Sequence, residues 1–264
     1  MISKAYRIKE FFNPTDGRSL IVDTSAGLSL GPVLGLESFK TEVEPILSLV
    51  DGVITSPGQS RVLSGRTRED AALLIRADWT NALRNKDFVL PPEKIHHITL
   101  LDSTHALDLG ASAMVLYFLL GHEENIEADC LKRSVQMAIQ GSQTGLPLIL
   151  DVQPVGERVV LLGKAIELGV SYALEVGADG AAIPWPGVES LELIIKMAAE
   201  MPVWVKSPEI FGEQSMLSNA LDLGASGIWL DERIFTERNT IETLQSIAQI
   251  THPDVLIREQ GLGA

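Results

Sequence analysis

A seven-residue phrase, ALDLGAS, occurs twice in the chain, at Ala106–Ser112 and at Ala220–Ser226, and a near-copy, AIELGVS, lies between them at Ala165–Ser171. The phrase reads as the end of an amphipathic helix, because its glycine can adopt the left-handed conformation that closes helices. The apolar, β-branched run that follows is typical of a buried strand. A chain that repeats helix, short loop and strand forms a parallel sheet covered by helices.

Eight segments have the apolar, β-branched composition of buried strands, and helical patterns separate most of them. The predicted strands are Ser19–Thr24, Gly52–Ser56, Ala72–Ala77, Ser112–Phe118, Pro147–Val152, Gly180–Ile183, Val203–Lys206 and Gly227–Leu230. The predicted helices are Leu36–Val50, Ser103–Leu109, Asn125–Gln143, Lys164–Val176, Val188–Met201, Gln214–Leu223 and Thr240–Ile250.

Eight strand–helix units in 264 residues predict a single-domain TIM (β/α)8 barrel over residues 1–264. Residues 1–16 would be an N-terminal extension and residues 78–101 a loop insertion after the third strand. The His96–His97 pair in that insertion is expected to be a loop feature and not a site. The alternative fold is a doubly wound open sheet, but DTSAGLSLG after the first strand contains neither a phosphate loop nor a dinucleotide fingerprint.

The composition excludes several classes of function. The formal net charge of −14 argues against nucleic acids and anionic membrane surfaces as partners, since both attract basic proteins. The single cysteine, Cys130, cannot form a disulfide within the chain, which favours a reducing compartment. The N-terminus lacks the apolar core of a signal peptide, so a cytoplasmic location is expected.

In a barrel, chemistry lies at the carboxyl ends of the strands, and here those ends are polar. Lys206 is the only lysine at a predicted strand end. An amine among apolar walls and carboxylates is suited to attack a carbonyl and form a Schiff base. The predicted catalytic residues are Lys206, Asp23, Asp78, Asp151 and Gln153, and the predicted substrate-binding residues are Ser25, Tyr117, Trp185, Ser207, Asp231 and Arg233.

Other interpretations of these residues remain open. Lys206 could form a structural ion pair with Asp231 or Glu209, because charge networks also fill barrel mouths without catalysis. The carboxylates could hold Mg²⁺, although no close D-x-D spacing supports a metal. Trp185 stands between two prolines and could stack on a ligand or close the barrel mouth.

Several phrases resemble, in order, those of the DhnA/DeoC-type class I aldolase superfamily, which includes the archaeal-type fructose-bisphosphate aldolases. They are GRSLIVDTSAGLSLGPVLG (residues 17–35), VDGVITSPG, GLPLILDVQPVG, LEVGADGAAIPWPG and LGASGIWLDERIF. The resemblance spans residues 17–235. It implies a TIM barrel, commonly oligomeric, with a Schiff-base lysine on the sixth strand, a small carbonyl substrate and neither metal nor cofactor.

The positions that carry the family's chemistry differ in this chain. The Schiff-base lysine position holds Ala182, the catalytic aspartate position holds Ser25, and the acid–base tyrosine position holds Gln153. The phosphate-binding phrases read Lys206-Ser207-Pro208 and Asp231-Glu232-Arg233. VWVKSPEI also resembles the seventh strand of deoxyribose-phosphate aldolase, a related barrel with a lysine there, which makes Lys206 the candidate for a displaced Schiff-base amine.

Two functional hypotheses follow. The first is a divergent class I aldolase-like carbon–carbon lyase that acts on a small carbonyl compound through Lys206. The second is a catalytically inactive aldolase-fold protein with a binding or scaffold role, favoured by the replacement of several family residues at once. A homo-oligomer is expected under either hypothesis.

Overall fold

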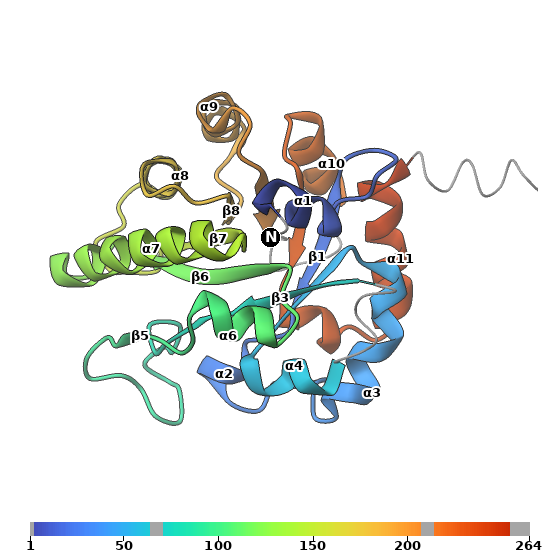
Figure 1. The fold of residues 1–264 in the computed structure, drawn as a ribbon, viewed down its shortest axis with the longest axis horizontal. Helices are drawn as coiled ribbons and strands as arrows, with labels where there is room; N and C mark the ends of the chain where they lie inside the picture. Colours follow the sequence, from blue (N-terminus) through green and yellow to red (C-terminus); the bar gives the residue numbers. More distant parts are fainter. Residues whose placement is uncertain (1–2, 64–70, 207–213, 254–264) are drawn as a thin grey trace, which may run out of the picture.

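The computed structural model describes residues 3–63, 71–206 and 214–253. Eight parallel strands close into a barrel with the order β1-β10-β9-β8-β7-β6-β3-β2, and helices surround it (Figure 1). The strands are β1 (Ser19–Asp23), β2 (Gly52–Thr55), β3 (Ala72–Arg76), β6 (Ala113–Leu119), β7 (Leu148–Gln153), β8 (Gly180–Ile183), β9 (Val203–Lys206) and β10 (Gly227–Leu230). The predicted TIM barrel is confirmed, and each strand lies within one residue of its predicted bounds.

The predicted helices are present with one break, and two further short helices, α2 and α4, were not predicted. They are α2 (Gly27–Leu30), α3 (Phe39–Val43), α4 (Pro57–Leu63), α6 (Ser103–Asp108), α7 (Glu124–Thr144), α8 (Leu162–Glu175), α9 (Val188–Ala198), α10 (Gln214–Asp222) and α11 (Thr240–Thr251). The helix expected over Leu36–Val50 is instead α3 followed by the 3-10 helix η2 (Glu44–Leu49). Pro45 is the second residue of η2 and lies in its first turn, where its missing N–H costs no backbone hydrogen bond.

Two apolar clusters hold the fold together. The larger lies between the barrel and the surrounding helices, and the smaller fills the barrel interior. Phe11 belongs to the inner cluster and is fully buried, with its ring centroid 5.9 Å from that of Trp204. Phe11 comes from η1 (Lys9–Phe11), which follows α1 (Lys4–Ile8), and Lys4 pairs with Asp179 at 2.8 Å. The predicted N-terminal extension therefore closes the end of the barrel opposite the strand carboxyl ends.

The segment expected as a loop insertion, 78–101, contains a short antiparallel pair, β4 (Asp78–Thr80) and β5 (His97–Thr99). Asn81 closes this hairpin, because its side chain donates to the Lys94 carbonyl at 2.8 Å and accepts from the His96 N–H at 2.7 Å. The hairpin and its connecting loop project from the barrel beside α7 (Figure 1). His97 lies on β5 and is buried, so the expectation that the His96–His97 pair is only a loop feature is wrong for His97.

Candidate functional site

The topmost layer of the barrel interior is made of charged residues. In TIM barrels the interior side chains stack in layers of four that come from alternate strands. Asp23 on β1, Arg76 on β3, Asp151 on β7 and Lys206 on β9 come from the first, third, fifth and seventh strands around this barrel. We call these four residues the charged quartet.

The layer below the quartet is apolar and comes from the other four strands. Ile54, Val115, Ala182 and Trp229 are the register partners of Asp23, Arg76, Asp151 and Lys206, respectively. All four of these partners belong to the inner apolar cluster. The charged quartet therefore forms the boundary between the apolar interior and the open carboxyl end of the barrel.

Ion pairs join the quartet into a chain of alternating charge. Arg76 Nη2 donates to Asp23 Oδ2 at 2.5 Å and to Asp151 Oδ2 at 2.9 Å, and Lys206 Nζ pairs with the second oxygen of Asp151. Two carboxylates and two cations balance, so the quartet carries no formal net charge. Lys206 therefore pairs with Asp151, and not with Asp231 as the structural alternative expected; Glu209, its other suggested partner, lies outside the described residues.

Arg76 is the centre of the site, and it was absent from the residues predicted to form it. Its guanidinium is fully buried and lies 3.8 Å from the centroid of the Tyr117 ring, and its Nε donates to Ser25 Oγ at 3.2 Å. Burial alone would lower the pKa of Arg76, but Tyr117 and the nearby carboxylates raise it well above its ordinary value. Arg76 is therefore a permanent cation between two aspartates.

The remaining contacts of Asp23 and Asp151 fix their orientation. Asp23 Oδ1 accepts from both the backbone N–H and the hydroxyl of Ser25, at 2.8 and 2.6 Å. Gln153 Nε2 donates to Asp151 Oδ1 at 3.0 Å, as alternation along β7 predicts for residues two apart. The structure thus brings Lys206, Asp23, Asp151, Gln153 and Ser25 together, as the sequence predicted.

Asp78 and Tyr117 lie behind the quartet. Asp78 is fully buried on β4, joins His97 Nε2 by a 2.6 Å hydrogen bond, and accepts from the backbone N–H of Tyr117 at 2.7 Å. His97 Nδ1 lies 3.4 Å from Cys130 Sγ. Burial raises the pKa of the Cys130 thiol to about 11, so it stays protonated near neutral pH. These residues support Tyr117 and Arg76 from behind, and Asp78 does not touch Lys206.

The end of β10 forms an acidic rim. Asp231 precedes the 3-10 helix η3 (Glu232–Thr236) and forms a bidentate ion pair with Arg233. Burial, followed by the charge of Asp231, raises the pKa of Glu232 to about 7, and Asp23 contributes in the same direction. Glu232 was not among the predicted site residues, although its position two residues after the end of β10 is a sequence signal that could have identified it.

Two of the predicted substrate-binding residues lie elsewhere or outside the described part of the chain. Trp185 is half-buried and packs against the apolar cluster between the barrel and its helices. Ser207 follows Lys206 directly and lies outside the described residues.

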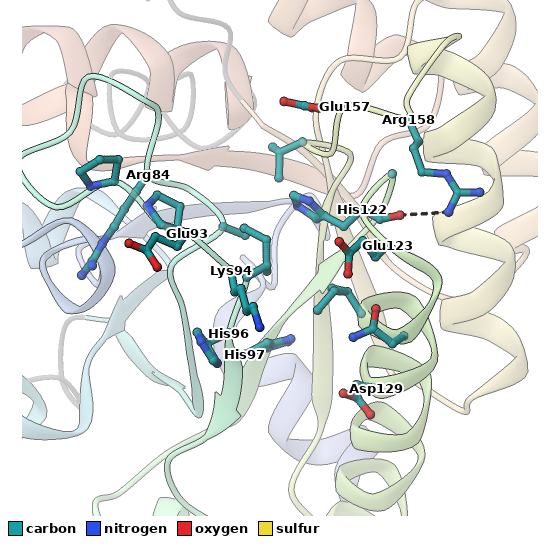
Figure 2. A pocket seen from close by; sticks show the side chains of 18 of the residues that line it. Arg84, Glu93, Lys94, His96, His97, His122, Glu123, Asp129, Glu157 and Arg158 are labelled. Carbon is teal, nitrogen blue, oxygen red and sulfur yellow. Dashed lines mark hydrogen bonds between the residues drawn. The ribbon is translucent and has the colours of Figure 1, made fainter.

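A cavity of about 1030 Å³ lies beside the barrel mouth, between the 78–101 insertion and the turns after β6 and β7 (Figure 2). Its labelled lining mixes basic and acidic side chains, among them Lys94, His122, Glu123, Asp129 and Arg158, and Arg158 donates to the His122 carbonyl at 3.3 Å (Figure 2). None of the quartet residues lines it. Its size alone does not make it the reaction site, because the chemistry requires a nucleophile and a base in contact.

A smaller cavity of about 300 Å³ adjoins the quartet where β1 and β2 end. Ser25, which hydrogen-bonds to both Asp23 and Arg76, is part of its wall. Thr24, Ser56 and Gln59 add further polar groups, while α2 and the segment leading to α3 supply apolar walls. This volume is at the lower end of the range for small-molecule sites.

Among the described residues, histidine, cysteine, aspartate and glutamate side chains do not gather in groups of three that could hold a metal ion. None of the described helices is long and apolar enough to cross a membrane.

Comparison with known proteins gives a consistent group of relatives. An aldolase of Pasteurella multocida, itself uncharacterised, is 25% identical over 250 residues, covering 93% of this chain and 81% of the relative. The 3-hydroxy-5-phosphonooxypentane-2,4-dione thiolase of Shigella flexneri is 24% identical over 250 residues, covering 93% of this chain and 92% of the relative. No protein-family model matches the chain.

Solved structures show the same fold. An archaeal fructose 1,6-bisphosphate aldolase superposes with a TM-score of 0.77 at 20% identity, over 95% of this chain and 100% of that one. The thiamine phosphate pyrophosphorylase of Pyrococcus furiosus superposes with a TM-score of only 0.53. The closed barrel and the similarity to aldolases and thiolases over most of the chain support its resemblance to the DhnA/DeoC-type class I aldolase superfamily.

Proposed function

We propose that this protein is a carbon–carbon lyase of the class I aldolase type, in which Lys206 forms the Schiff base with a small carbonyl substrate. The observation that carries the proposal is the contact between Lys206 Nζ and Asp151 in the topmost barrel layer. The Lys206 side chain is 16% exposed, whereas that of Asp151 is fully buried. An amine with solvent access and a hydrogen-bonded carboxylate is the arrangement that imine formation requires.

Asp151 has a defined part in forming the imine. It accepts one proton from the Lys206 ammonium, and the amine lone pair then attacks the substrate carbonyl carbon. The second amine proton passes to the former carbonyl oxygen, which gives a carbinolamine. Asp151 returns its proton to the hydroxyl, water leaves, and an iminium ion remains. The charge of the ammonium is thus conserved in the iminium, so the balance of the quartet is the same before and after.

Carbon–carbon cleavage requires a second base. The hydroxyl two carbons from the iminium loses its proton, the carbon–carbon bond breaks, and its electron pair forms an enamine on Lys206. Glu232 is assigned as the proton acceptor, because a carboxyl group with a pKa of about 7 both accepts and donates protons near neutral pH. Glu232 then protonates the enamine carbon, and water hydrolyses the new iminium to release the second product.

The alternative is a binding barrel without aldol chemistry. It is favoured by Ala182, which by the sequence resemblance stands where the family has its Schiff-base lysine, and by the pairing of Asp151 with both Arg76 and Lys206. In that case the quartet would be a structural ion-pair network.

The experiment that separates the two is hydrogen–deuterium exchange at the carbon next to a carbonyl, followed by NMR in D₂O. An enamine on Lys206 exchanges that proton, whereas a binding protein does not. We expect exchange with the wild type and its loss in Lys206→Ala. The matched control is Lys164→Ala, which removes an exposed lysine paired with Glu167 and should exchange like the wild type. Exchange that persists in Lys206→Ala would contradict the proposal.

A further inference from the structure

The 300 Å³ cavity beside the quartet has a lining suited to neutral, hydroxylated ligands. Among the described residues of its wall none is charged, and its polar groups are the hydroxyls of Thr24, Ser25 and Ser56 and the amide of Gln59. Leu28 and Phe39 are among the residues that supply apolar surface. The Thr24 hydroxyl donates to the Ile54 carbonyl and the Ser25 hydroxyl donates to Asp23, so towards a ligand these two groups act as acceptors. The Ser56 hydroxyl and the Gln59 amide can both donate and accept, so the wall as a whole matches alcohol and carbonyl oxygens.

The cations at the mouth already have anionic partners. Arg76 is held between Asp23 and Asp151, Lys206 pairs with Asp151, and Arg233 pairs with Asp231. A phosphate group arriving at the mouth would have to displace one of these carboxylates. Removing one partner from a buried ion pair leaves an uncompensated charge, which is strongly unfavourable.

The rim at the end of β10 also disfavours anions. Asp231 and Glu232 are consecutive there, and burial together with the charge of Asp231 raises the pKa of Glu232. A second anion at this rim would meet the same repulsion. A phosphate binds where glycine-rich turns present backbone N–H groups, and η3 begins here with two carboxylates instead.

From these three observations we infer that the substrate is a small, unphosphorylated hydroxycarbonyl compound whose hydroxylated end occupies the cavity lined by Thr24, Ser25, Ser56 and Gln59. This inference rests on the proposed function for the reacting carbonyl at Lys206, but the preference for an uncharged ligand comes from the cavity and the rim. It differs from what the names of the thiolase and fructose-bisphosphate aldolase relatives say of their own substrates, which are phosphorylated.

The test compares a matched pair of probes, dihydroxyacetone and dihydroxyacetone phosphate. Binding of each probe by saturation-transfer NMR and exchange of its carbon-bound protons are both measured on the wild type and on Lys206→Ala. We expect dihydroxyacetone to bind at least tenfold more tightly than its phosphate in both proteins. We expect Gln59→Ala to weaken dihydroxyacetone binding several-fold, while Gln143→Ala, on exposed α7 surface, leaves it unchanged. Leu28→Arg places a cation in the cavity and should reverse the preference.

The outcomes separate this inference from the proposed function. If the unphosphorylated probe binds preferentially but is not exchanged, the substrate class holds and the Schiff-base function fails. If the phosphate binds as tightly or more tightly and is exchanged through Lys206, the function holds and the inference is overturned. Absence of binding by dihydroxyacetone at high millimolar concentration, or a preference unaffected by Leu28→Arg, also overturns the inference.

Discussion

Arg76 is fully buried. Among the described lysines and arginines, we expect its replacement by methionine to lower the free energy of unfolding the most. Methionine keeps much of the side-chain length but leaves Asp23 and Asp151 without the guanidinium that bridges them at 2.5 and 2.9 Å. Asp151 keeps its ion pair with Lys206, whereas Asp23 loses its cation. Removing one partner of a buried ion pair costs about 3–5 kcal/mol, because the remaining charge stays buried and unpaired. For a domain of this size that corresponds to a fall in Tm of roughly 6–20 °C.

The assay is urea denaturation followed by circular dichroism, with Arg158→Met as the matched control. Arg158 is 61% exposed and lies 3.7 Å from a carboxylate of Glu124 that is itself 90% exposed, so its loss should cost about 0–1 kcal/mol. The double variant Arg76→Met/Asp23→Asn should recover part of the loss, with a coupling free energy of about 1 kcal/mol or more. A cost for Arg76→Met below about 1 kcal/mol, similar to that of Arg158→Met, would refute the assignment of Arg76 as the centre of the quartet.

Three further predictions concern pH and packing. The pKa of Glu232 is raised from 4.5 to about 7, so its ionisation destabilises the fold as pH rises through this window. By pH 8 the unfolding free energy of Glu232→Gln should therefore exceed that of the wild type by about 3 kcal/mol. Burial alone would lower the pKa of His252, but its hydrogen bonds to Asp51 and Asp16 raise it. The stabilising contribution of His252 is complete below about pH 6.5 and is lost as pH rises through its folded-state pKa. His252→Ala should therefore lower the unfolding free energy more at about pH 6 than at about pH 9. A methyl group on Gly156 would lie 2.0 Å from the carbonyl carbon of Gly121, so Gly156→Ala should lower the unfolding free energy by about 1–3 kcal/mol, whereas Gly58→Ala meets nothing within 4 Å and should be neutral or slightly stabilising. Equal effects of the two alanines, or pH-independent effects of the other two variants, would contradict these assignments.

The barrel could be predicted from the sequence because its signal is repeated. Apolar β-branched runs recur eight times, and glycine ends such as Gly110 and Gly224, both with positive φ, mark where helices close before strands. The β4–β5 hairpin was missed because each strand has three residues, too few for alternation to be visible. The role of Phe11 was missed because nothing in a local pattern shows that an N-terminal aromatic will pack inside a barrel.

The site was predicted in part, and the missing residue has a physical explanation. Alternation placed Asp23 with Ser25 and Asp151 with Gln153, and both pairs are in contact. Arg76 was overlooked because a fully buried arginine is rare, and the two carboxylates that pair with it here lie 53 and 75 residues away in the sequence. The layer rule for alternate barrel strands would have grouped Arg76 with Asp23, Asp151 and Lys206 once the eight strands were known.

The central claim is that Lys206 forms an imine. The most direct measurement is borohydride trapping with a panel of small aldehydes and ketones, phosphorylated and unphosphorylated, followed by intact mass and peptide mapping. The account predicts a reduced adduct on the peptide that contains Lys206, greatest with an unphosphorylated compound, and absent in Lys206→Ala. An adduct on another lysine, or no adduct with any member of the panel, would contradict it.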